Sequence, residues 1–314
     1  MRLGIDLGGS KIEIVALGPA DDELHRARTA TPQTYEGVLA AVAGLVTAAE
    51  RVAGPAESLG IGVPGSIGPA TGVMRGANAT CLNGRPLDSD LSSSLGRPVI
   101  LENDANCFAL AEAVAGAGCG AGSVFGVILG TGVGGGIVID GRLLSGATRV
   151  AGEWGHTPLP LPTDAERPGP LCYCGRRGCV ETWVSGPALA RDHRDATGRA
   201  LTPPEIAEAA RRDDPAATAT LWRHRERLGR ALGPVVNILD PEVIVLGGGL
   251  SGLPGLAEGL PAALAPHVFS DQPATRVVRN RLGDSAGVLG AAWLGARDPR
   301  AVASGGQPRA DRFR

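Results

Sequence analysis

One pattern occurs twice in this chain, and it limits the folds that the chain can adopt. Near the N-terminus the apolar, β-branched runs RLGIDL and KIEIVAL are joined by GGS, which predicts a β-hairpin with a glycine turn. More than a hundred residues later, SVFGVIL, GTGVGG and GIVIDG repeat the order of strand, glycine turn and strand. A duplicated unit of this kind predicts an α/β protein with two related lobes that face one another across a cleft.

The remaining segments alternate between helical and extended patterns. YEGVLAAVAGLVTAAERV has helical periodicity, SLGIGV is typical of a short buried strand, and PVILEN followed by DANCFALAEAVAGA predicts a strand and then a helix. Residues 185–239 are expected to be helical, PEVIVLGGGL to form a buried strand that runs into glycines, and DSAGVLGAAWLGA to form a closing helix that packs on the first lobe.

These segments suggest a division into domains. We expect a small N-terminal α/β domain at residues 1–117, completed by the C-terminal helix 284–296, and a large α/β domain at residues 118–283. The tail, residues 298–314, has little apolar content and is expected to be disordered.

Charge and hydropathy exclude several classes of protein. The formal net charge is −2, so no large basic field is available to attract nucleic acid. The N-terminus enters RLGIDLGG directly, with an aspartate where a signal peptide needs its apolar region, and no later apolar run is long enough to span a bilayer. We expect a cytoplasmic protein without a nucleic-acid or membrane partner.

Three of the six cysteines stand within LCYCGRRGCVE, residues 171–181. A reducing cytoplasm disfavours a structural disulfide, and the spacing of Cys172, Cys174 and Cys179 is not the Cys-x-x-Cys of a redox site. The two glycines of the loop would let three thiolates converge on one zinc ion. His156 in AGEWGH is the best candidate for the fourth ligand, because the other histidines lack comparable glycine-rich surroundings. The alternative is a set of buried, inert thiols; three cysteines at this spacing favour zinc.

The glycine turns are candidates for a phosphate site. DLGGSK at residues 6–11 and LGTGVGGG at residues 129–136 could each present backbone N–H groups at a hairpin bend, a concavity that suits phosphate oxygens. Two such turns on opposing lobes could hold one polyphosphate, whereas GGS taken alone is better explained as a tight hairpin without a ligand. Asp6 ends the first strand, where a carboxylate can hold the water shell of a nucleotide's Mg²⁺ or can simply cap the turn.

Two other nucleotide motifs do not fit. GTGVGG matches G-x-G-x-x-G at Gly130, Gly132 and Gly135. That fingerprint opens a helix and needs an acidic residue about 20 positions later, whereas GIVIDG predicts a returning strand. A Walker loop needs a lysine followed by Ser or Thr, and the only lysine, Lys11, is followed by Ile12.

Asp104 in LENDANCF is the candidate catalytic base. It stands where a buried strand ends and a helix starts, so it is also a candidate N-cap, and the two roles can coexist. The positive end of the helix keeps the carboxylate ionised, which suits a group that accepts a proton from a sugar hydroxyl during phosphoryl transfer. Polar side chains that could surround a sugar occur in the neighbouring motifs: Asn78, Asn103, Glu153, His156 and Glu181.

Seven motifs follow one another along the chain: DLGGSK, IGVPGSIGP, LENDANC, ILGTGVGGG, AGEWGH, CYCGRRGCVE and VIVLGGG. In this order they resemble the ROK family (repressor, open reading frame, kinase) of bacterial sugar kinases, over nearly the whole chain apart from the tail. ANATCLNGRPLDSDL and CYCGRRGCVETWVSG look most like the fructokinase and mannokinase branch, and the N-acetylglucosamine kinases are near relatives. Ser10 departs from the family, which commonly has threonine there, but the hydroxyl is kept.

The resemblance implies the actin-like, hexokinase-like (ribonuclease H-like) two-lobed fold, with ATP and Mg²⁺ as phosphoryl donor and a hexose in the interlobe cleft. Asp104 would be the base. The sugar would be bound by Gly65, Asn78, Asn103, Asp104, Glu153, His156 and Glu181. The nucleotide would be bound by Asp6, Gly8, Gly9, Ser10, Lys11, Gly130, Thr131, Gly132, Gly134, Gly247, Gly248 and Gly249. A structural Zn²⁺ would be held by His156, Cys172, Cys174 and Cys179, and His156 would touch the sugar through its other nitrogen.

The resemblance also sets the expected activity. It implies transfer of a phosphoryl group to the C6 hydroxyl of a hexose, with D-fructose expected from the branch and mannose, N-acetylglucosamine and glucose left open, and it implies a homodimer. A sugar-responsive repressor is disfavoured, because repressors of the family carry a DNA-binding helical domain before the first strand. A non-catalytic sugar-sensing protein remains the alternative from a different class.

Overall fold

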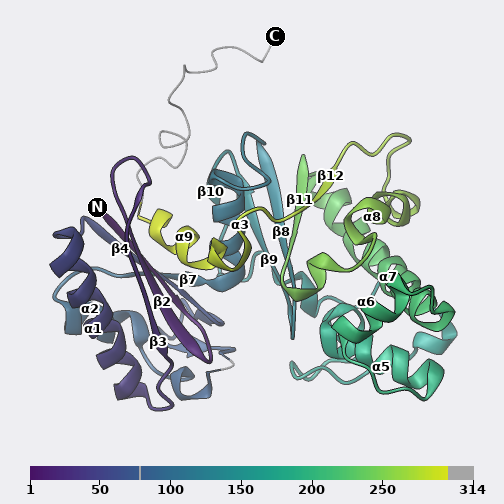
Figure 1. The fold of residues 1–314 in the computed structure, drawn as a ribbon, viewed down its shortest axis with the longest axis horizontal. Helices are drawn as coiled ribbons and strands as arrows, with labels where there is room; N and C mark the ends of the chain where they lie inside the picture. Colours follow the sequence, from purple (N-terminus) through teal and green to yellow (C-terminus); the bar gives the residue numbers. More distant parts are fainter. Residues whose placement is uncertain (78, 296–314) are drawn as a thin grey trace, which may run out of the picture. The chain divides into compact units, whose positions relative to one another are not determined.

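The computed structural model describes residues 1–77 and 79–295, so Asn78 and the tail expected at residues 298–314 lie outside the described residues. The chain forms two compact units, whose elements are labelled in Figure 1. Unit 1 comprises Met1–Gly120, Gly141–Ala151 and the segment that starts at Asp284, and unit 2 comprises Ala121–Asp140 and Gly152–Gly283. The segment Gly141–Ala151 therefore packs in unit 1, whereas the boundaries expected from the sequence place it in the second domain.

The hairpin predicted at the N-terminus forms the centre of the sheet in unit 1. The strand order is β3 (Glu23–Ala30), β2 (Lys11–Leu17), β1 (Arg2–Leu7), β4 (Ser58–Val63) and β7 (Ile100–Asn103). β1 and β2 pair antiparallel, with Asp6 opposite Glu13, whereas β4 and β7 continue the sheet in parallel with β1. Three further short strands have the bounds β5 (Ser66–Ile67), β6 (Met74–Arg75) and β10 (Arg142–Leu143). The sequence pattern did not indicate β3, whose side chains are mostly exposed or half-buried.

Helices cover both faces of this sheet (Figure 1). One face is covered by α1 (Tyr35–Ala53) with α2 (Leu87–Leu95), and the other by α3 (Asp104–Val114) with α9 (Ala286–Trp293). The predicted helix α1 begins after Thr34, whose side chain accepts a hydrogen bond from the Gly37 amide at 3.3 Å. It buries Val38, Val42 and Val46, a spacing that places one apolar stripe against the sheet.

The predicted closing helix is present as α9, and small residues let it approach the rest of unit 1 closely. A Cβ atom on Gly4 of β1 would collide with the carbonyl oxygen of Val288. A Cβ atom on Gly290 would likewise collide with the carbonyl oxygen of Cys107 in α3. The C-terminal helix thus completes the core that the N-terminal strands begin.

The sheet of unit 2 repeats the arrangement of unit 1. Its neighbouring strands include, in order, β9 (Val133–Ile139), β8 (Ser123–Leu129), β11 (Val243–Gly247) and β12 (Arg276–Arg279). β8 pairs antiparallel with β9 and parallel with β11, and β11 pairs parallel with β12. This is the order and direction of β2, β1, β4 and β7, so the structure confirms the predicted duplication. The glycine turn after β8 leads into a strand, which excludes the dinucleotide fingerprint.

The helices of unit 2 fill the segment that the sequence predicts to be helical. They are α4 (Glu181–Val184), α5 (Gly186–Thr197), α6 (Pro203–Arg211) and α7 (Pro215–Leu239), followed by α8 (Leu256–Leu264) and by short 3-10 helices that include η2 (Trp154–His156) and η4 (Gly249–Gly252). α7 begins after Asp214, whose carboxylate accepts hydrogen bonds from the amides of Ala216 and Ala217. α7 and α8 pack on one another in the core of the unit.

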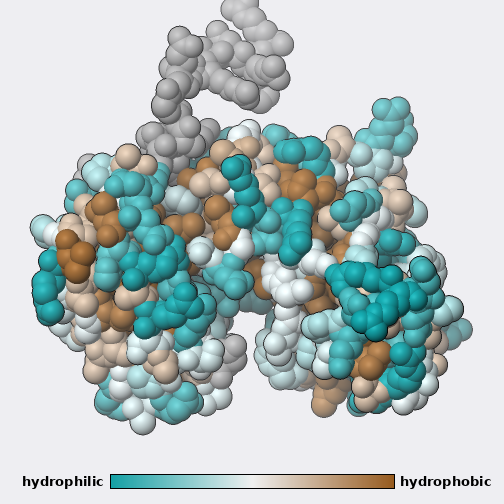
Figure 2. Space-filling model, viewed as in Figure 1, coloured by the Kyte–Doolittle hydropathy of each residue, from teal (hydrophilic) through white to brown (hydrophobic). Residues whose placement is uncertain are grey.

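Hydrophilic residues cover most of the surface that Figure 2 shows, and hydrophobic ones form small groups among them. No helix within the described parts of the chain is both long and apolar enough to cross a bilayer. Among the largely exposed apolar side chains are Phe269, Ile238 and Tyr173. Tyr173 belongs to the cysteine loop.

Candidate active site

The first glycine turn is a tight hairpin that carries charged residues at both ends. The Gly8 amide donates to the Lys11 carbonyl at 2.9 Å, and the Thr31 hydroxyl donates to the Gly8 carbonyl at 2.7 Å. Gly9 and Ser10 are exposed at the bend. Lys11 forms an ion pair with Glu13 at 3.2 Å. The turn is therefore the predicted tight hairpin, with Gly9 and Ser10 at its exposed bend and Lys11 at the start of β2; its role as a phosphate site stays a prediction.

Asp6 and Asp104 form an interacting pair of carboxylates in unit 1. Burial and the negative charge of Asp104 together raise the pKa of Asp6 to about 6, and the positive charge of Lys11 opposes this shift. Gly287 at the start of α9 lies against the same carboxylate, because a Cβ atom there would stand 3.3 Å from Asp6 Oδ2. A divalent cation would relieve the repulsion between the two aspartates.

The junction of β7 and α3 fixes Asp104. Asn103 is the N-cap, since its side-chain oxygen accepts from the Ala105 amide at 2.9 Å, and Asp104 is the first residue of the helix. This corrects the assignment of Asp104 as the N-cap, although Asp104 Oδ1 also accepts from the Ala105 amide at 2.8 Å. Asn103 Nδ2 donates to the Gly65 carbonyl at 3.2 Å. Gly65 has a φ of 83°, so the left-handed turn explains why glycine stands there.

Glu102 supports this junction and was not found from the sequence. Its Oε1 accepts from the Asn103 amide and from Asn106 Nδ2, both at 2.9 Å, and its Oε2 accepts from the Ser145 hydroxyl at 2.7 Å. A buried glutamate in a strand has no sequence signal of its own, because its partners include a residue more than forty positions away. Glu102 therefore orients the residues that precede the candidate base.

The second glycine turn is held by the region that follows the cysteine loop. The Gly130 amide donates to the Gly132 carbonyl at 2.9 Å, and the Gly186 amide donates to the Gly130 carbonyl at 2.8 Å. The Glu181 carboxylate accepts a hydrogen bond from the Val133 amide at 2.9 Å. A Cβ atom on Gly132 would stand 2.7 Å from Glu181 Oε2. Glu181, expected to face a sugar, thus also fixes the expected phosphate turn.

A cavity of about 720 Å³ lies beside this turn within unit 2. Gly130, Thr131 and Gly249, three of the residues expected to bind the nucleotide, line it. The sequence did not reveal the rest of the wall, which comes from α5, α6 and the loop between them and includes Pro187, Arg191, Arg194, Leu201 and Pro203. Gly248 precedes η4 with a φ of 77°. The cavity is large enough for a nucleoside.

The cysteine loop and His156 form a cluster that fits a tetrahedral zinc site. One ligand atom from each of His156, Cys172, Cys174 and Cys179 lies within 4.8 Å of all the others. The Sγ atoms of Cys174 and Cys179 are 3.6 Å apart, and Cys172 Sγ is 3.5 Å from His156 Nδ1. Zinc bonds of about 2.3 Å to sulfur and about 2.0 Å to nitrogen give tetrahedral edges of about 3.8 Å and about 3.5 Å. The cluster therefore matches the predicted ligand set in identity and spacing.

Backbone hydrogen bonds and two glycines with positive φ set the shape of the cysteine loop. The Cys172 amide donates to the Arg176 carbonyl at 2.8 Å, and Gly175 and Gly178 have φ values of 86° and 71°. Burial raises the pKa of Cys179 to about 12, whereas a hydrogen bond from the backbone of Arg176 lowers the pKa of Cys174 to about 6. A bound cation would stabilise all three thiolates.

Trp154 anchors the segment that carries Glu153 and His156. Its ring is buried, its Nε1 donates to the Gly134 carbonyl of β9 at 2.9 Å, and it meets Phe125 edge to face at 5.9 Å. His156 Nδ1 faces Cys172, and His156 Nε2 is 2.8 Å from the Tyr173 hydroxyl. The prediction that the second nitrogen of His156 touches the sugar stays untested, and in this structure that nitrogen contacts the Tyr173 hydroxyl.

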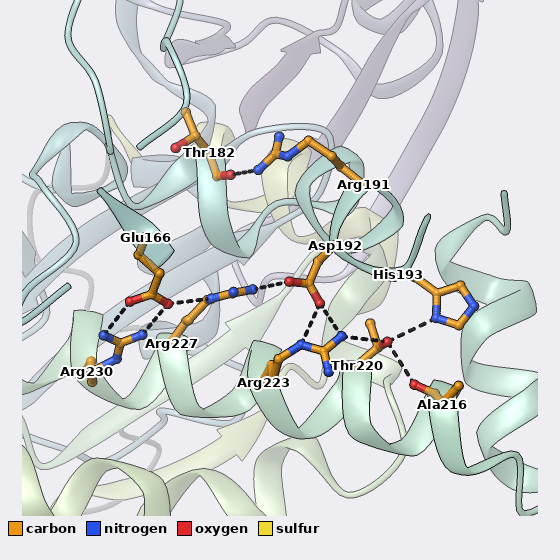
Figure 3. A network of polar contacts seen from close by, with 10 residues as sticks. All are labelled: Glu166, Thr182, Arg191, Asp192, His193, Ala216, Thr220, Arg223, Arg227 and Arg230. Atoms are coloured by element: carbon orange, nitrogen blue, oxygen red, sulfur yellow. Dashed lines mark hydrogen bonds and ion pairs between the residues drawn. The ribbon is translucent and has the colours of Figure 1, made fainter. Parts of the chain in front are cut away.

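A network of ion pairs and hydrogen bonds links several segments of unit 2 (Figure 3). Arg227 of α7 bridges Glu166, at 2.9 Å, and Asp192 of α5, at 2.7 Å. Arg230 pairs with Glu166 at 2.7 Å, and Arg223 pairs with Asp192 at 2.7 Å. The network joins the segment before the loop to two helices, and no local sequence pattern indicates it.

Comparisons with known proteins agree with the motifs. A model of the ROK family matches residues 2–298. An N-acetylgalactosamine kinase of Shewanella sp. (strain ANA-3) is 39% identical over 298 residues, which cover 94% of this chain and 96% of that protein. An N-acetyl-D-glucosamine kinase of Escherichia coli O6:H1 is 38% identical over 305 residues, which cover 95% of this chain and 100% of that protein.

Solved structures give the same result for the fold. A ROK hexokinase from Thermus thermophilus has a TM-score of 0.84 and 38% identity, over 93% of this chain and 96% of that one. A ROK family glucokinase from Streptomyces griseus, solved with glucose and AMPPNP, has a TM-score of 0.75 and 31% identity, over 93% of this chain and 98% of that one. The fold is the two-lobed, actin-like α/β fold of these sugar kinases, as predicted.

Proposed function

The chain belongs to the ROK family, and from that premise we propose that it is an ATP-dependent kinase that phosphorylates the C6 hydroxyl of a hexose or an N-acetylhexosamine. The observation that carries the proposal is the pair of carboxylates Asp6 and Asp104 in unit 1. They stand at the carboxyl ends of the parallel strands β1 and β7, where α/β sheets bind their ligands. The names of the relatives described above support a sugar as the acceptor and ATP as the donor.

Asp104 is the general base in this proposal. Its place in the first turn of α3 favours the ionised carboxylate, and Asn103 and Glu102 fix the junction before it. Asp104 takes the proton from the C6 hydroxyl as that oxygen forms a bond to the γ-phosphorus and the bond to the bridging oxygen of ADP breaks. The products are ADP and a sugar 6-phosphate. Such a base contributes roughly 10²- to 10⁴-fold to the rate.

Each glycine turn contains residues of the set that the family resemblance assigns to the nucleotide. Asp6 would hold the water shell of Mg²⁺, and the turns at Gly8–Lys11 and Gly130–Gly134 would present amides to phosphate oxygens. The adenosine occupies the cavity lined by Thr131, Gly249 and the α5–α6 wall. Bound Mg²⁺ neutralises charge on the transferring phosphoryl group. Lys11 would contact the phosphates if its half-exposed side chain exchanged Glu13 for them, and Glu13 would keep its ion pair with Arg26.

The family resemblance assigns the sugar to polar side chains of several motifs. Asn103 and Gly65 lie beside the candidate base in unit 1, and Asn78, outside the described residues, belongs to the same expected set. His156 belongs to the candidate zinc cluster of unit 2, Glu153 precedes the 3-10 helix that carries His156, and Glu181 starts α4 directly after the cysteine loop. The zinc is structural in this proposal, because four protein ligands leave no open position for a substrate.

The identity of the sugar rests on the relatives rather than on branch resemblance. The relatives described above are named for N-acetylgalactosamine, N-acetylglucosamine and glucose. These names favour an aldose or its N-acetyl derivative. D-fructose, expected from the motifs, and mannose stay predictions to be tested beside them.

A panel of sugars tests the proposal. Wild-type protein with ATP and Mg²⁺ is assayed for ADP production with N-acetylglucosamine, N-acetylgalactosamine, glucose, mannose and fructose, and NMR locates the phosphate on the product. We expect sugar-dependent ADP and a 6-phosphate. Sugar binding without ADP production would instead support a non-catalytic sensor, and phosphorylation at another carbon would remove the C6 assignment.

A further inference from the structure

Arg191 of α5 lines the cavity of about 720 Å³ in unit 2 that the proposed function assigns to the nucleoside. Among the described residues of the cavity wall, only Arg191 and Arg194 carry a charge. Arg194 is mostly exposed and pairs with Asp195 at 2.9 Å. Arg191 is half-buried, and its Nη2 donates to the carbonyl oxygen of Thr182 in α4 (Figure 3). Arg191 therefore stands at the cavity with a neutral partner, whereas Arg194 has an anionic one.

The charge of Arg191 is not offset by its surroundings. Burial lowers the pKa of its guanidinium, and the charges of Asp195 and Asp192 oppose this shift without cancelling it. Neither carboxylate forms an ion pair with Arg191 in the described part of the chain, because Asp195 pairs with Arg194 and Asp192 pairs with Arg227 at 2.7 Å. A half-buried cation that lacks an ion pair is stabilised by an anionic ligand.

The Arg191 side chain reaches toward the glycine turn after β8. Side chains of an α-helix lean toward its N-terminus, and Arg191 lies about 7.5 Å along α5 from its first residue, Gly186. The contact with Thr182, which precedes α5 in the chain, shows that the guanidinium extends to that end of the helix. The Gly186 amide donates to the Gly130 carbonyl of the turn at 2.8 Å. The guanidinium and the turn therefore both lie at the start of α5.

A phosphate at this turn needs a nearby cation. The Glu181 carboxylate accepts from the Val133 amide at 2.9 Å and so brings negative charge to the turn. The helices in the cavity wall do not supply free amides in compensation. α6 begins with Pro203 and Pro204, which have no N–H group. In α5 the Gly186 amide is already bound to the turn, and the next residue is also a proline.

We propose that Arg191 binds the phosphates of the nucleotide beside the turn at Gly130–Gly134, and that Arg194 does not. A guanidinium has five N–H donors, so one can stay on the Thr182 carbonyl while others bind phosphate oxygens. The nucleoside then lies against the apolar part of the wall, which includes Leu201. This inference rests on the proposed kinase function and adds to its nucleotide site a residue outside the sequence motifs.

Arg191→Met tests the inference, because it removes the charge and keeps an unbranched side chain. Binding of adenosine, and of ADP with Mg²⁺, to the full chain is measured by calorimetry. We expect ADP to bind about 10- to 100-fold more weakly, the loss typical of a hydrogen bond between charged groups, and adenosine to bind within about twofold of wild type. Arg194→Met is the matched comparison, since Arg194 lines the same cavity but is paired with Asp195. Its ratio of ADP affinity to adenosine affinity should stay within about twofold of wild type.

Arg191→Lys decides the inference even if Arg191→Met fails to fold. Lysine keeps a charge but lacks the planar group that can hold the Thr182 carbonyl and a phosphate together. We expect ADP to bind about three- to tenfold more weakly and adenosine to bind within about twofold of wild type. Equal weakening of ADP and adenosine in either Arg191 variant would assign Arg191 a structural role and overturn the inference. Unchanged ADP binding, or an equally selective loss of ADP in Arg194→Met, would also overturn it.

The two affinities keep this inference separate from the proposed function. A wild-type protein that binds ADP but phosphorylates no sugar contradicts the kinase function, whereas the role of Arg191 is still decided by its variants. A wild-type protein that binds no ADP contradicts both.

Discussion

The two units repeat one strand order but use their acidic side chains in opposite ways. In unit 1, Asp6 is buried beside a second carboxylate, and burial together with Asp104 raises its pKa to about 6. In unit 2, burial also acts on Glu166, but hydrogen bonds from Arg230, the Thr163 backbone and Arg227 outweigh it and lower the pKa to about 2. Asp6 has too little positive charge near it to offset its burial, whereas the hydrogen bonds of Glu166 keep that carboxylate ionised.

This difference in pKa distinguishes a candidate reactive carboxylate, Asp6, from a structural one, Glu166. A carboxylate that is costly to ionise is ready to take up a proton or a divalent cation, which is the usual condition of a working site. A carboxylate locked between arginines contributes to stability and resists titration. The same contrast applies to the hairpins, since the turn after β1 has Asp6 and Lys11 beside it, whereas the turn after β8 is fixed by Glu181.

The largest effect should come from the base of unit 1. Asp104→Asn keeps the helix start, because Asn103 remains the N-cap, but it removes the proton acceptor. We expect kcat to fall by roughly 10²- to 10⁴-fold with the sugar KM nearly unchanged. Steady-state kinetics measure both constants. Asp88→Asn, in the first turn of α2, is the control and should leave kcat unchanged. Near-normal turnover of Asp104→Asn would place the chemistry elsewhere.

The next effect concerns stability and comes from unit 2. Glu166→Gln leaves Arg227 and Arg230 without their shared carboxylate, and breaking a buried pair in this way costs about 3–5 kcal/mol of the free energy of unfolding. Thermal unfolding measures the loss. Glu208→Gln is the matched control, because Glu208 also pairs with two arginines but is exposed, and such pairs contribute about 0–1 kcal/mol. Equal losses would show that burial does not set the difference.

The free energy of unfolding of the wild-type protein should depend on pH through Glu166. The folded pKa of Glu166 lies below its ordinary value of 4.5, so its stabilising contribution is present above pH 4.5 and is lost as pH falls toward 2. The sequence predicted neither the ion-pair network around Glu166 nor the lowering of the pKa of Glu166. Glu166, Asp192 and Arg227 lie on separate segments, and only tertiary packing brings them together.

Local patterns explain what the sequence did predict. Both hairpins, α1, β4, β7 and α9 follow from apolar periodicity and glycine turns, which act within a few residues. The cysteine cluster was predictable because the spacing within CYCGRRGC is itself the signal and needs no knowledge of the fold. The contacts of Glu102, Glu181 and Tyr173 were not predictable, because each depends on a partner brought near by folding.

A smaller effect is expected from Asp6. Its folded pKa of about 6 exceeds the ordinary 3.8, so wild-type stability falls as pH rises from about 4 to about 6 and stays lower above that. Asp6→Asn removes this cost and should raise the free energy of unfolding at pH 8 by up to about 3 kcal/mol, with little change at pH 4. It should also weaken the Mg²⁺ dependence of turnover. Thermal midpoints at the two pH values, together with Mg²⁺ titrations of the rate, measure both effects. A variant no more stable than wild type at pH 8 would contradict the raised pKa of Asp6.

The smallest expected effect tests whether Glu181 fixes the second glycine turn. Glu181→Gln keeps an oxygen that can accept from the Val133 amide but removes the charge that strengthens the bond. If Glu181 fixes the turn at Gly130–Gly132, the KM for ATP should rise about three- to tenfold, alongside any rise in the KM for sugar. Glu153→Gln is the matched comparison, because Glu153 is expected to face the sugar from a separate segment and should raise the sugar KM alone. Both variants lose one negative charge among the residues expected to face the sugar. A difference between their KM values for ATP therefore reports the contact between Glu181 and the turn. An ATP KM that is equal in the two variants would mean that the second turn holds its shape without the carboxylate of Glu181.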